Sequence, residues 1–181
     1  PGYIEKVVER VNGLNPHMIC FTGDLVHNFA EEAEPFTGIL SEMKAPLGKY
    51  AVLGNHDYGT YYRWDSGQEM QENLARVKDQ FRAAGFDLLL NEHRTVEQDG
   101  GVIEVVGVEN WGKPPFPQRG DLEKAMEGTS PGRPTVLLSH DPSHWDLKVR
   151  GMEEIELTLS GHTHGMQMGI EWGRLRWSPS R

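Results

Sequence analysis

The sequence contains few cysteines, no long apolar run and fewer basic than acidic residues. Its 181 residues include one cysteine, Cys20, which excludes a disulfide within the chain. No apolar stretch approaches the roughly 20 residues that span a bilayer. Lysine and arginine number 18 against 27 aspartates and glutamates, a formal charge of −9. Because this charge opposes capture of a nucleic-acid backbone, no nucleic-acid partner is expected.

The chain has the composition of one ordinary globular domain. It is 37% hydrophobic and 25% charged, and it is long enough to bury a core. We therefore expect residues 1–181 to form a single domain. Both ends look cut: a helical apolar period begins almost at Pro1, where an α/β unit usually has a strand first, and the chain stops in the strand-like "RLRWSPSR".

Between its ends the sequence alternates strand and helix patterns. After an expected helix over 4–14, we predict helices near 31–44, weakened by Pro35, and over 67–84, ended by Gly85. The expected strands are "MICFTGD", "KYAVLGN", "DLLLNE", "RTVEQ", "GVIEVVGV", "PTVLLSH" and "IELTLSGH". Helices early and strands late predict an α/β sandwich, with two sheets and helices outside.

Polar residues follow four of the apolar runs at the point where each run ends. These runs are "CFTGD" at Asp24, "AVLGNHD" at Asn55, "VLLSHD" at His140 and "TLSGHTH" at His162 and His164. Strand ends are where α/β folds place ligands, because the loops that follow converge on one edge of the sheet. A carboxylate, an amide oxygen and imidazoles form a mixed nitrogen and oxygen ligand set that suits Mn, Fe or Zn.

These segments carry a family resemblance. "GD", "GNHD", "SHD" and "GHTHG" stand in the order and approximate spacing of the calcineurin-like metallophosphoesterases, over roughly residues 4–170. "TGDLV", "GNHDY" and "SGHTHG" look most similar to bacterial phosphohydrolases that are often tethered to the inner membrane by an N-terminal segment. The resemblance implies a four-layered α/β/β/α sandwich of two mixed sheets flanked by helices, with two divalent metal ions (Mn, Fe or Zn) at one edge.

The resemblance also implies a role for each ligand. Asp24 would bridge both metals, Asn55, His140 and His162 would complete one site, and His164 would bind the other metal. The family's first motif, an Asp-x-His on the first strand, is absent from this chain. We expect that motif on the strand missing before the first helix, so one metal site is complete here and the other is not.

The implied activity is metal-dependent hydrolysis of a phosphomonoester, phosphodiester or pyrophosphate bond by attack of a metal-bridging hydroxide. In the family the position of His56 lies near the substrate and assists departure of the leaving-group oxygen, and an imidazole can donate that proton near neutral pH. Asp57 either orients His56 or stabilises the loop, and both interpretations remain open.

Substrate contacts are expected from loops beside the metals. In "YGTYYRWDS", Arg63 could fork onto a phosphate while Tyr58 and Trp64 hold an apolar or planar group. The alternative is that these aromatics only pack the loop onto the next helix. Trp111 and Lys113 form a possible opposite wall with the same ambiguity. Met166, where the family often has glycine, is expected near the rim.

The four histidines outside these motifs have no ligand spacing. His17, His27, His93 and His144 are expected at the surface, His27 nearest to the metals. The expected partner is a small phosphorylated or lipid-linked substrate, with membrane contact only through a preceding anchor. The expected location is cytoplasmic or membrane-associated in a bacterium. The alternatives are a noncatalytic scaffold or inactive fragment on the same fold, disfavoured because every ligand within the covered span is present, and a nuclease of the same superfamily, disfavoured by the acidic balance.

Overall fold

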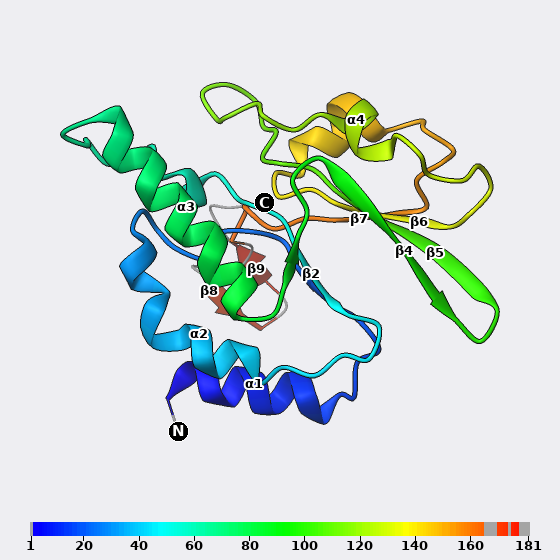
Figure 1. The fold of residues 1–181 in the computed structure, drawn as a ribbon, viewed down its shortest axis with the longest axis horizontal. Coiled ribbons are helices and arrows are strands. Elements are labelled where there is room, and N and C mark those ends of the chain that lie inside the picture. The colour runs from blue at the N-terminus through cyan, green and yellow to red at the C-terminus, as the bar shows by residue number, and fades with distance from the viewer. Residues whose placement is uncertain (1, 165–169, 174, 178–181) are drawn as a thin grey trace.

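A computed structural model describes residues 2–164, 170–173 and 175–177, whose strands form sheets faced by helices (Figure 1). The helices and helical turns are α1 (Tyr3–Gly13), η1 (Ala30–Glu32), α2 (Glu34–Ser41), η2 (His56–Tyr58), α3 (Gly67–Ala83), α4 (Leu122–Met126) and the π-helical turn η3 (Trp145–Val149). The strands are β1 (Ile19–Phe21), β2 (Lys49–Ala51), β3 (Asp87–Leu88), β4 (Glu92–Gln98), β5 (Gly101–Gly107), β6 (Thr135–Leu138), β7 (Leu157–Leu159), β8 (Ile170–Trp172) and β9 (Leu175–Trp177).

The strands that position the candidate site belong to two sheets. The first is parallel, in the order β1-β2-β3, and the second has the order β4-β5-β6-β7. In the second sheet β4 pairs antiparallel with β5, whereas β5, β6 and β7 are parallel. The carboxyl ends of β1 and β2, and those of β6 and β7, therefore lie on common edges. Separately, β8 and β9 form an antiparallel pair.

Three apolar clusters separate the layers, and neighbouring residues of one strand enter different clusters. On β2, Ala51 packs against the helices α1, α2 and α3, whereas Tyr50 packs toward the second sheet. On β6, Leu138 faces the first sheet and Leu137 packs against α4 and η3. This alternation follows from the two-residue period of a strand, which buries both faces of each sheet. The predicted four-layered sandwich is confirmed.

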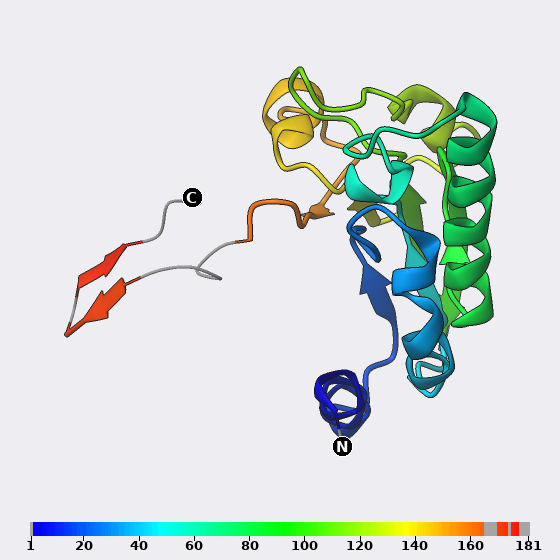
Figure 2. The same ribbon diagram turned by 90° about the vertical axis from the view of Figure 1, so that its left-hand side faces the viewer.

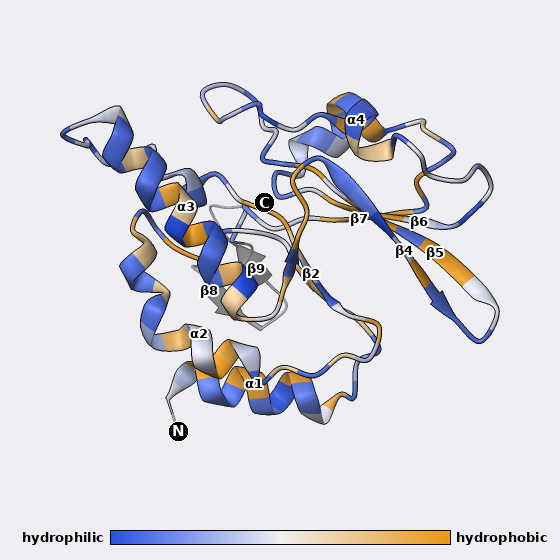
Figure 3. Cartoon of the chain, viewed as in Figure 1, coloured by the Kyte–Doolittle hydropathy of each residue, from blue (hydrophilic) through white to orange (hydrophobic). Residues whose placement is uncertain are grey.

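The helices α1, α2 and α3 pack apolar residues against the first sheet. In Figure 2, where the left-hand side of Figure 1 faces the viewer, α2 and α3 lie in front of part of the first sheet. Apolar residues interrupt the polar surface along α1, α2 and α3, and β5 is largely hydrophobic where its partner β4 is largely hydrophilic (Figure 3). No helix of the described residues is long and apolar enough to cross a membrane.

The expected helices agree with the structure, with one difference. The helix predicted over 67–84 is α3, which begins after Ser66, whose side chain accepts the Glu69 amide, and is followed by Gly85 at φ +81°. The helix expected near 31–44 is divided into η1 and α2, because Pro35 has no amide hydrogen and fits only the first turn of a helix. The short elements α4 and η3 were not expected.

Candidate functional site

Four strand ends bring Asp24, Asn55, His140 and His162 together, and we call these four residues the ligand cluster. The Nε2 atom of His140 lies 3.1 Å from Oδ2 of Asp24 and 3.0 Å from Oδ1 of Asn55. The same Asn55 oxygen lies 2.7 Å from Nδ1 of His162. Ligand atoms of Asp24, His140 and His162 all lie within 4.8 Å of one another, close enough to share one metal ion.

His164 lines the same cavity as three members of the cluster. This cavity of about 410 Å³ is bordered by Asp24, His140, His162 and His164 and by the backbone around Gly23 and Ser160 to Thr163. The His164 side chain is exposed. Both histidines of "GHTHG" therefore line one cavity.

Two cluster residues and the neighbouring His164 adopt the left-handed backbone conformation that residues other than glycine disfavour. The φ angle is +60° at Asp24, +69° at His162 and +50° at His164. Such conformations cost on the order of 1–3 kcal/mol each and persist only where the surroundings enforce them. The chain turns abruptly at these positions, and the turns direct the side chains into the cavity.

The polar atoms of the cluster fit a cation. Nδ1 of His140 donates a hydrogen bond to the carbonyl oxygen of Thr22 at 2.6 Å, which leaves Nε2 with a lone pair in the neutral ring. That lone pair faces oxygen atoms of Asp24 and Asn55, which also carry lone pairs. On its other side, Nδ2 of Asn55 donates to Oη of Tyr61 at 2.8 Å. Converging lone pairs repel one another unless positive charge lies among them, so this donor set suits a divalent metal.

The surroundings shift the pKa values of Asp24 and His140 toward the charged forms and that of His162 toward the neutral form. Burial lowers the pKa of His140, but the hydrogen bond and negative charge of Asp24 outweigh burial and raise it. Burial raises the pKa of Asp24, but His140 and the His56 amide outweigh it and lower it. For His162, burial dominates and lowers the pKa, which favours the neutral ring that binds metals.

Gly54 lets the loops after β1 and β2 approach closely. A Cβ atom on Gly54 would overlap a carboxylate oxygen of Asp24 and would lie 2.6 Å from the Asp24 amide nitrogen and 2.7 Å from Cε1 of His140. Atoms in ordinary contact are at least 3.4 Å apart. The glycine before Asn55 is therefore required for the packing of Asp24 against His140, in addition to any freedom it gives the turn.

His56 lies beside the cluster. Its backbone amide donates to Oδ1 of Asp24 at 3.0 Å, and its Nδ1 donates to the carbonyl oxygen of His27 at 2.9 Å. Its ring stacks on the His27 ring, with centroids 4.6 Å apart, and contacts the Tyr61 ring at 4.8 Å. Because a carbonyl only accepts, Nδ1 carries a hydrogen and Nε2 is the nitrogen able to exchange a proton.

Asp57 is fully buried, and its carboxylate accepts four backbone hydrogen bonds. Oδ2 accepts from the amides of Asp24 and Gly54 at 3.0 and 2.8 Å, and Oδ1 accepts from Leu25 and Val26 at 2.8 and 3.3 Å. Burial raises its pKa to about 7; the Gly54 amide lowers it and the charge of Asp24 raises it further. Among the contacts of the described residues, none joins Asp57 to the His56 ring. These bonds favour the loop-stabilising interpretation over orientation of His56.

The loop expected to bind substrate is divided between surface and core. Arg63 is exposed, consistent with access to a phosphate. Tyr58 is 1% exposed, and its hydroxyl donates to Glu109 and accepts from the Asn110 amide, so the predicted substrate contact does not match its buried position. Nε1 of Trp64 donates to the Gly59 carbonyl at 2.7 Å, which favours packing of the loop over substrate binding.

The expectation that His144 lies at the surface is wrong. His144 is 1% exposed, and its Nδ1 lies 2.8 Å from Oγ of Ser139. The turn after β6 folds its ring beneath Trp111, with centroids 5.1 Å apart. Burial and the charge of Lys148 lower its pKa to about 4, with Asp141 acting in the opposite direction. Of the remaining three, His17 and His27 are exposed, and His93 is half-buried.

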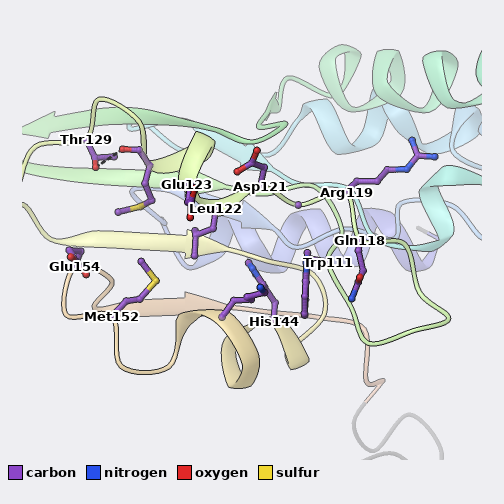
Figure 4. Close-up of a pocket in the computed structure, with 13 residues that line it drawn as sticks. Trp111, Gln118, Arg119, Asp121, Leu122, Glu123, Thr129, His144, Met152 and Glu154 are labelled. Carbon is purple, nitrogen blue, oxygen red and sulfur yellow. Dashed lines mark hydrogen bonds between the residues drawn. The ribbon is translucent and has the colours of Figure 1, made fainter.

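A larger cavity, of about 860 Å³, lies away from the ligand cluster. It is bordered by α4, η3, part of the loop 111–121 and the segment around Met152 to Glu154. Trp111 and His144 lie side by side at one end, and Met152 and Glu154 lie at the other (Figure 4). Its lining mixes apolar, acidic and basic groups, and its size alone does not make it the reaction site. The candidate metal ligands Asp24, His140 and His162 line the smaller cavity.

Sequence reasoning missed two aromatic neighbours of the cluster. Tyr61 holds the Asn55 amide, and the Phe116 ring meets the His162 ring edge-on, with centroids 4.7 Å apart. Their loops were recognised as aromatic, but no spacing rule distinguished these two rings from others nearby. Lys113 is exposed and Trp111 half-buried. Met166 lies outside the described residues.

Comparison with known proteins finds relatives that are named as metallophosphoesterases or as a pyrophosphatase. The chain is 26% identical to the UDP-2,3-diacylglucosamine pyrophosphatase LpxG of Chlamydia muridarum, covering 94% of this chain and 60% of that protein. It is 29% identical to the uncharacterized metallophosphoesterase YkuE of Bacillus subtilis, covering 92% and 54%. It is 30% identical to a transmembrane protein with metallophosphoesterase domain of Danio rerio, covering 91% and 37%. The chain thus spans 60% or less of the length of these three relatives.

A solved structure has the same fold. The Haemophilus influenzae NAD nucleotidase NadN superimposes with a TM-score of 0.61 at 18% identity, over 90% of this chain and 33% of that one. The sequence profile of the calcineurin-like phosphoesterases matches residues 1–166, which include Asp24, Asn55, His140, His162 and His164. This chain, with its two-sheet sandwich, belongs to the calcineurin-like phosphoesterase family.

Proposed function

We propose that this chain is the catalytic part of a phosphohydrolase that works with two divalent metal ions, Mn, Fe or Zn. The observation that carries the proposal is the convergence of side-chain nitrogen and oxygen atoms of Asp24, Asn55, His140 and His162. Asp24 would bridge the two ions and the other three residues would complete one site. His164, which lines the same cavity, would bind the second ion.

The chemistry that bound divalent ions supply at such a site is activation of water and neutralisation of phosphoryl charge. The chain provides the geometry for this chemistry. The Thr22 carbonyl holds His140 in the tautomer whose Nε2 faces the cluster, and the His56 amide holds one oxygen of Asp24. Carbonyl and amide partners of this kind orient the ligands and set their basicity.

His56 is the proposed proton donor to the leaving oxygen. With Nδ1 bonded to the His27 carbonyl, its Nε2 is the atom that would release the proton. Asp57 acts indirectly, because the four hydrogen bonds that its carboxylate accepts from backbone amides fix the segment that carries Asp24. Of the three residues predicted to contact substrate, we retain Arg63, whose exposed guanidinium suits a phosphate.

The proposed substrate is a small phosphorylated or lipid-linked molecule. Support comes from the Chlamydia relative, whose name identifies a pyrophosphatase acting on a diacylated sugar nucleotide. Among the three bond types expected from the sequence, that relative favours the pyrophosphate bond.

The decisive test is the number of Mn²⁺ ions bound by this chain, measured by calorimetric titration near neutral pH. One tight equivalent is expected, held by the ligand cluster. Replacing His162→Ala removes one ligand, and the affinity should fall by more than about 100-fold, the upper end of the loss seen when only an outer partner of a ligand is removed. His17→Ala is the matched control, because His17 is exposed and is not a member of the cluster.

The alternative outcomes have separate meanings. Two tight equivalents in the parent chain would show that His164 and Asp24 are joined by ligands not yet identified. No binding, or equal affinity in His162→Ala and the parent, would contradict the proposed metal centre. Hydrolysis of a phosphodiester and a pyrophosphate probe, with and without Mn²⁺, then tests which bond is cleaved.

A further inference from the structure

The backbone amides of residues 24–30 all donate to oxygen atoms of side chains. Asp57 accepts from the first three amides, Glu32 from the next three and Asn73 from the last. Residues 24–29 belong to no helix or strand, so these bonds satisfy amides that regular structure would otherwise pair. Two of the three acceptors are carboxylates, whose hydrogen bonds are stronger than those of neutral groups. Side chains therefore set the course of the whole segment.

Glu32 bonds to more amides than its place in η1 requires. It is an exposed residue, yet its Oε1 accepts from Asn28 and Phe29 at 3.1 and 3.0 Å, and its Oε2 accepts from His27 at 2.6 Å. The third residue of a helical turn commonly reaches back to the amide that precedes the turn, which here is that of Phe29. Burial raises the pKa of Glu32, but the three amides outweigh burial and lower it, so the carboxylate is ionised and only accepts. The bonds to His27 and Asn28 go beyond a helix cap.

The peptide group between His27 and Asn28 connects Glu32 to His56. Its N–H, on Asn28, donates to Glu32, and its carbonyl oxygen, on His27, accepts from Nδ1 of His56 at 2.9 Å. Because a peptide group is planar, the bond that fixes its N–H also fixes the direction of its carbonyl. The His27 ring, on the other side of the same carbonyl, stacks on the His56 ring at 4.6 Å and 28°.

The next peptide group is held in the same way. Its N–H, on Phe29, donates to Glu32, and its carbonyl oxygen, on Asn28, accepts from Nδ2 of Asn73 at 2.8 Å. Asn73 is 5% exposed and lies in α3, so it anchors this part of the loop to the packed helix. The loop is therefore fixed to α3 at one end, and Glu32 sets the orientation of the peptide groups between that anchor and His27.

We propose that Glu32 is a positioning residue of His56: its carboxylate holds the peptide group that directs the His27 carbonyl at Nδ1 of His56 and places the His27 ring against the imidazole. Nε2 of His56 is thereby kept in the position from which it gives its proton to the leaving oxygen. The inference rests on the proposed function, because that function makes His56 a proton donor. Among the contacts of the described residues, none joins Glu32 to the His56 ring, so Glu32 acts through His27.

Glu31 provides a matched control. It is the neighbouring acid and is also exposed, but its carboxylate pairs with the Arg76 guanidinium instead of the loop amides. Glu31→Ala and Glu32→Ala remove the same group from adjacent positions. If Glu32→Ala did not fold, the pair Glu31→Gln and Glu32→Gln would carry the comparison, because glutamine keeps only one acceptor oxygen.

The experiment is ¹⁵N NMR of the histidine rings in the metal-free parent and the variants, with the His56 signals identified by their absence in His56→Gln. Couplings to the carbon-bound ring hydrogens report which nitrogen of the neutral ring carries the hydrogen. We expect it on Nδ1 in the parent and in Glu31→Ala, because a carbonyl only accepts. In Glu32→Ala the ratio of Nδ1–H to Nε2–H rings should fall by about 5-fold, the equivalent of one ordinary hydrogen bond. An unchanged ratio in Glu32→Ala, or an equal change in Glu31→Ala, would overturn the inference.

Turnover separates this inference from the proposed function. With Mn²⁺ and a phosphodiester probe, Glu32→Ala should lower kcat by about 10-fold and leave KM within about 2-fold, because proton donation is lost and binding is not. Mn²⁺ affinity should stay within about 2-fold of the parent, since the Asp24 amide is held by Asp57 and not by Glu32. A parent without turnover would contradict the proposed function and leave the NMR comparison as the test of Glu32. Parent-like kcat in a Glu32→Ala variant whose His56 ratio has fallen would show that the alignment does not serve proton donation and would refute the proposed role.

Discussion

Because the loops approach closely at Gly54, adding one methyl group there tests whether Asp24 and His140 hold the same metal ion. In Gly54→Ala the new Cβ would lie 2.6 Å from the Asp24 amide nitrogen and 2.7 Å from Cε1 of His140, where ordinary contact begins at 3.4 Å. The two sides must therefore separate by 0.7 to 0.8 Å, the difference between these distances. The atoms involved belong to backbone and to a buried ring, which cannot swing aside as a flexible side chain would.

This displacement affects metal binding more than folding. Overpacking of this size costs about 1–3 kcal/mol, whereas domains of this kind are stable by about 5–15 kcal/mol. Metal–ligand distances, in contrast, tolerate only about 0.2 Å. Oδ2 of Asp24 and Nε2 of His140 lie 3.1 Å apart, and both are candidate ligand atoms. If the new methyl group pushes these two residues apart, they can no longer hold the same ion. We therefore expect a folded Gly54→Ala variant that no longer binds Mn²⁺ tightly.

Two measurements on the same preparation check this expectation. Urea unfolding should show a loss of about 1–3 kcal/mol, and calorimetry should show no tight Mn²⁺ equivalent. Gly38→Ala is the control, because Gly38 lies in α2 with open space at its Cβ position. The free energy of unfolding of this variant should rise by about 0.5–1 kcal/mol, and the variant should bind Mn²⁺ as the parent does. Parent-like Mn²⁺ affinity in Gly54→Ala would refute the reasoning, because the ligand pair would then tolerate the separation.

Two other predictions concern buried titratable groups. His144 has its pKa lowered to about 4 in the folded chain by burial and by Lys148, against 6.5 for the free side chain, so its contribution is complete above pH 6.5 and is lost as pH falls toward 4. About 2 kcal/mol should be lost by pH 5, and His144→Gln should reduce the difference between urea unfolding at pH 7.5 and pH 5 by that amount; an unchanged difference would contradict the assignment. Asp57→Asn leaves two of the four amides without an acceptor and should destabilise the metal-free chain by about 3 kcal/mol in urea. If turnover fell while stability stayed the same, Asp57 would instead be an orienting partner of His56.

Much of the fold could be predicted because its signals are local. The 3.6-residue period located α1 and α3, and apolar runs followed by short polar stretches located β1, β2, β6 and β7. Where the strands of one sheet are parallel, their carboxyl ends share an edge, so the convergence of Asp24 with Asn55 and of His140 with His162 follows from topology. The elements α4 and η3 have five residues each, too few for a period to appear.

What the sequence could not show is which groups hold the ligands. The Thr22 carbonyl that fixes His140 is 118 residues away from it, and Asp57 reaches the Asp24 amide across 33 residues. Such pairs depend on the final packing of loops from different strands, not on any local pattern. His144 is the same case, because the turn after β6 places an otherwise ordinary loop histidine beneath Trp111.

The hydrogen bonds that connect these loops, called ties here, also determine whether metal binding or folding is lost first when the chain is perturbed. Asp24 and His162 occupy left-handed conformations that cost on the order of 1–3 kcal/mol each. At Asp24 this cost is offset by the hydrogen bond that its amide donates to the Asp57 carboxylate and by the His56 amide, which donates to its side chain. The loop can relax its strain if any tie is weakened, while the three apolar clusters that hold the layers stay intact. Damage to these ties should therefore abolish metal binding before it unfolds the domain, which is the pattern expected when strain is concentrated at the site and stability lies in the core.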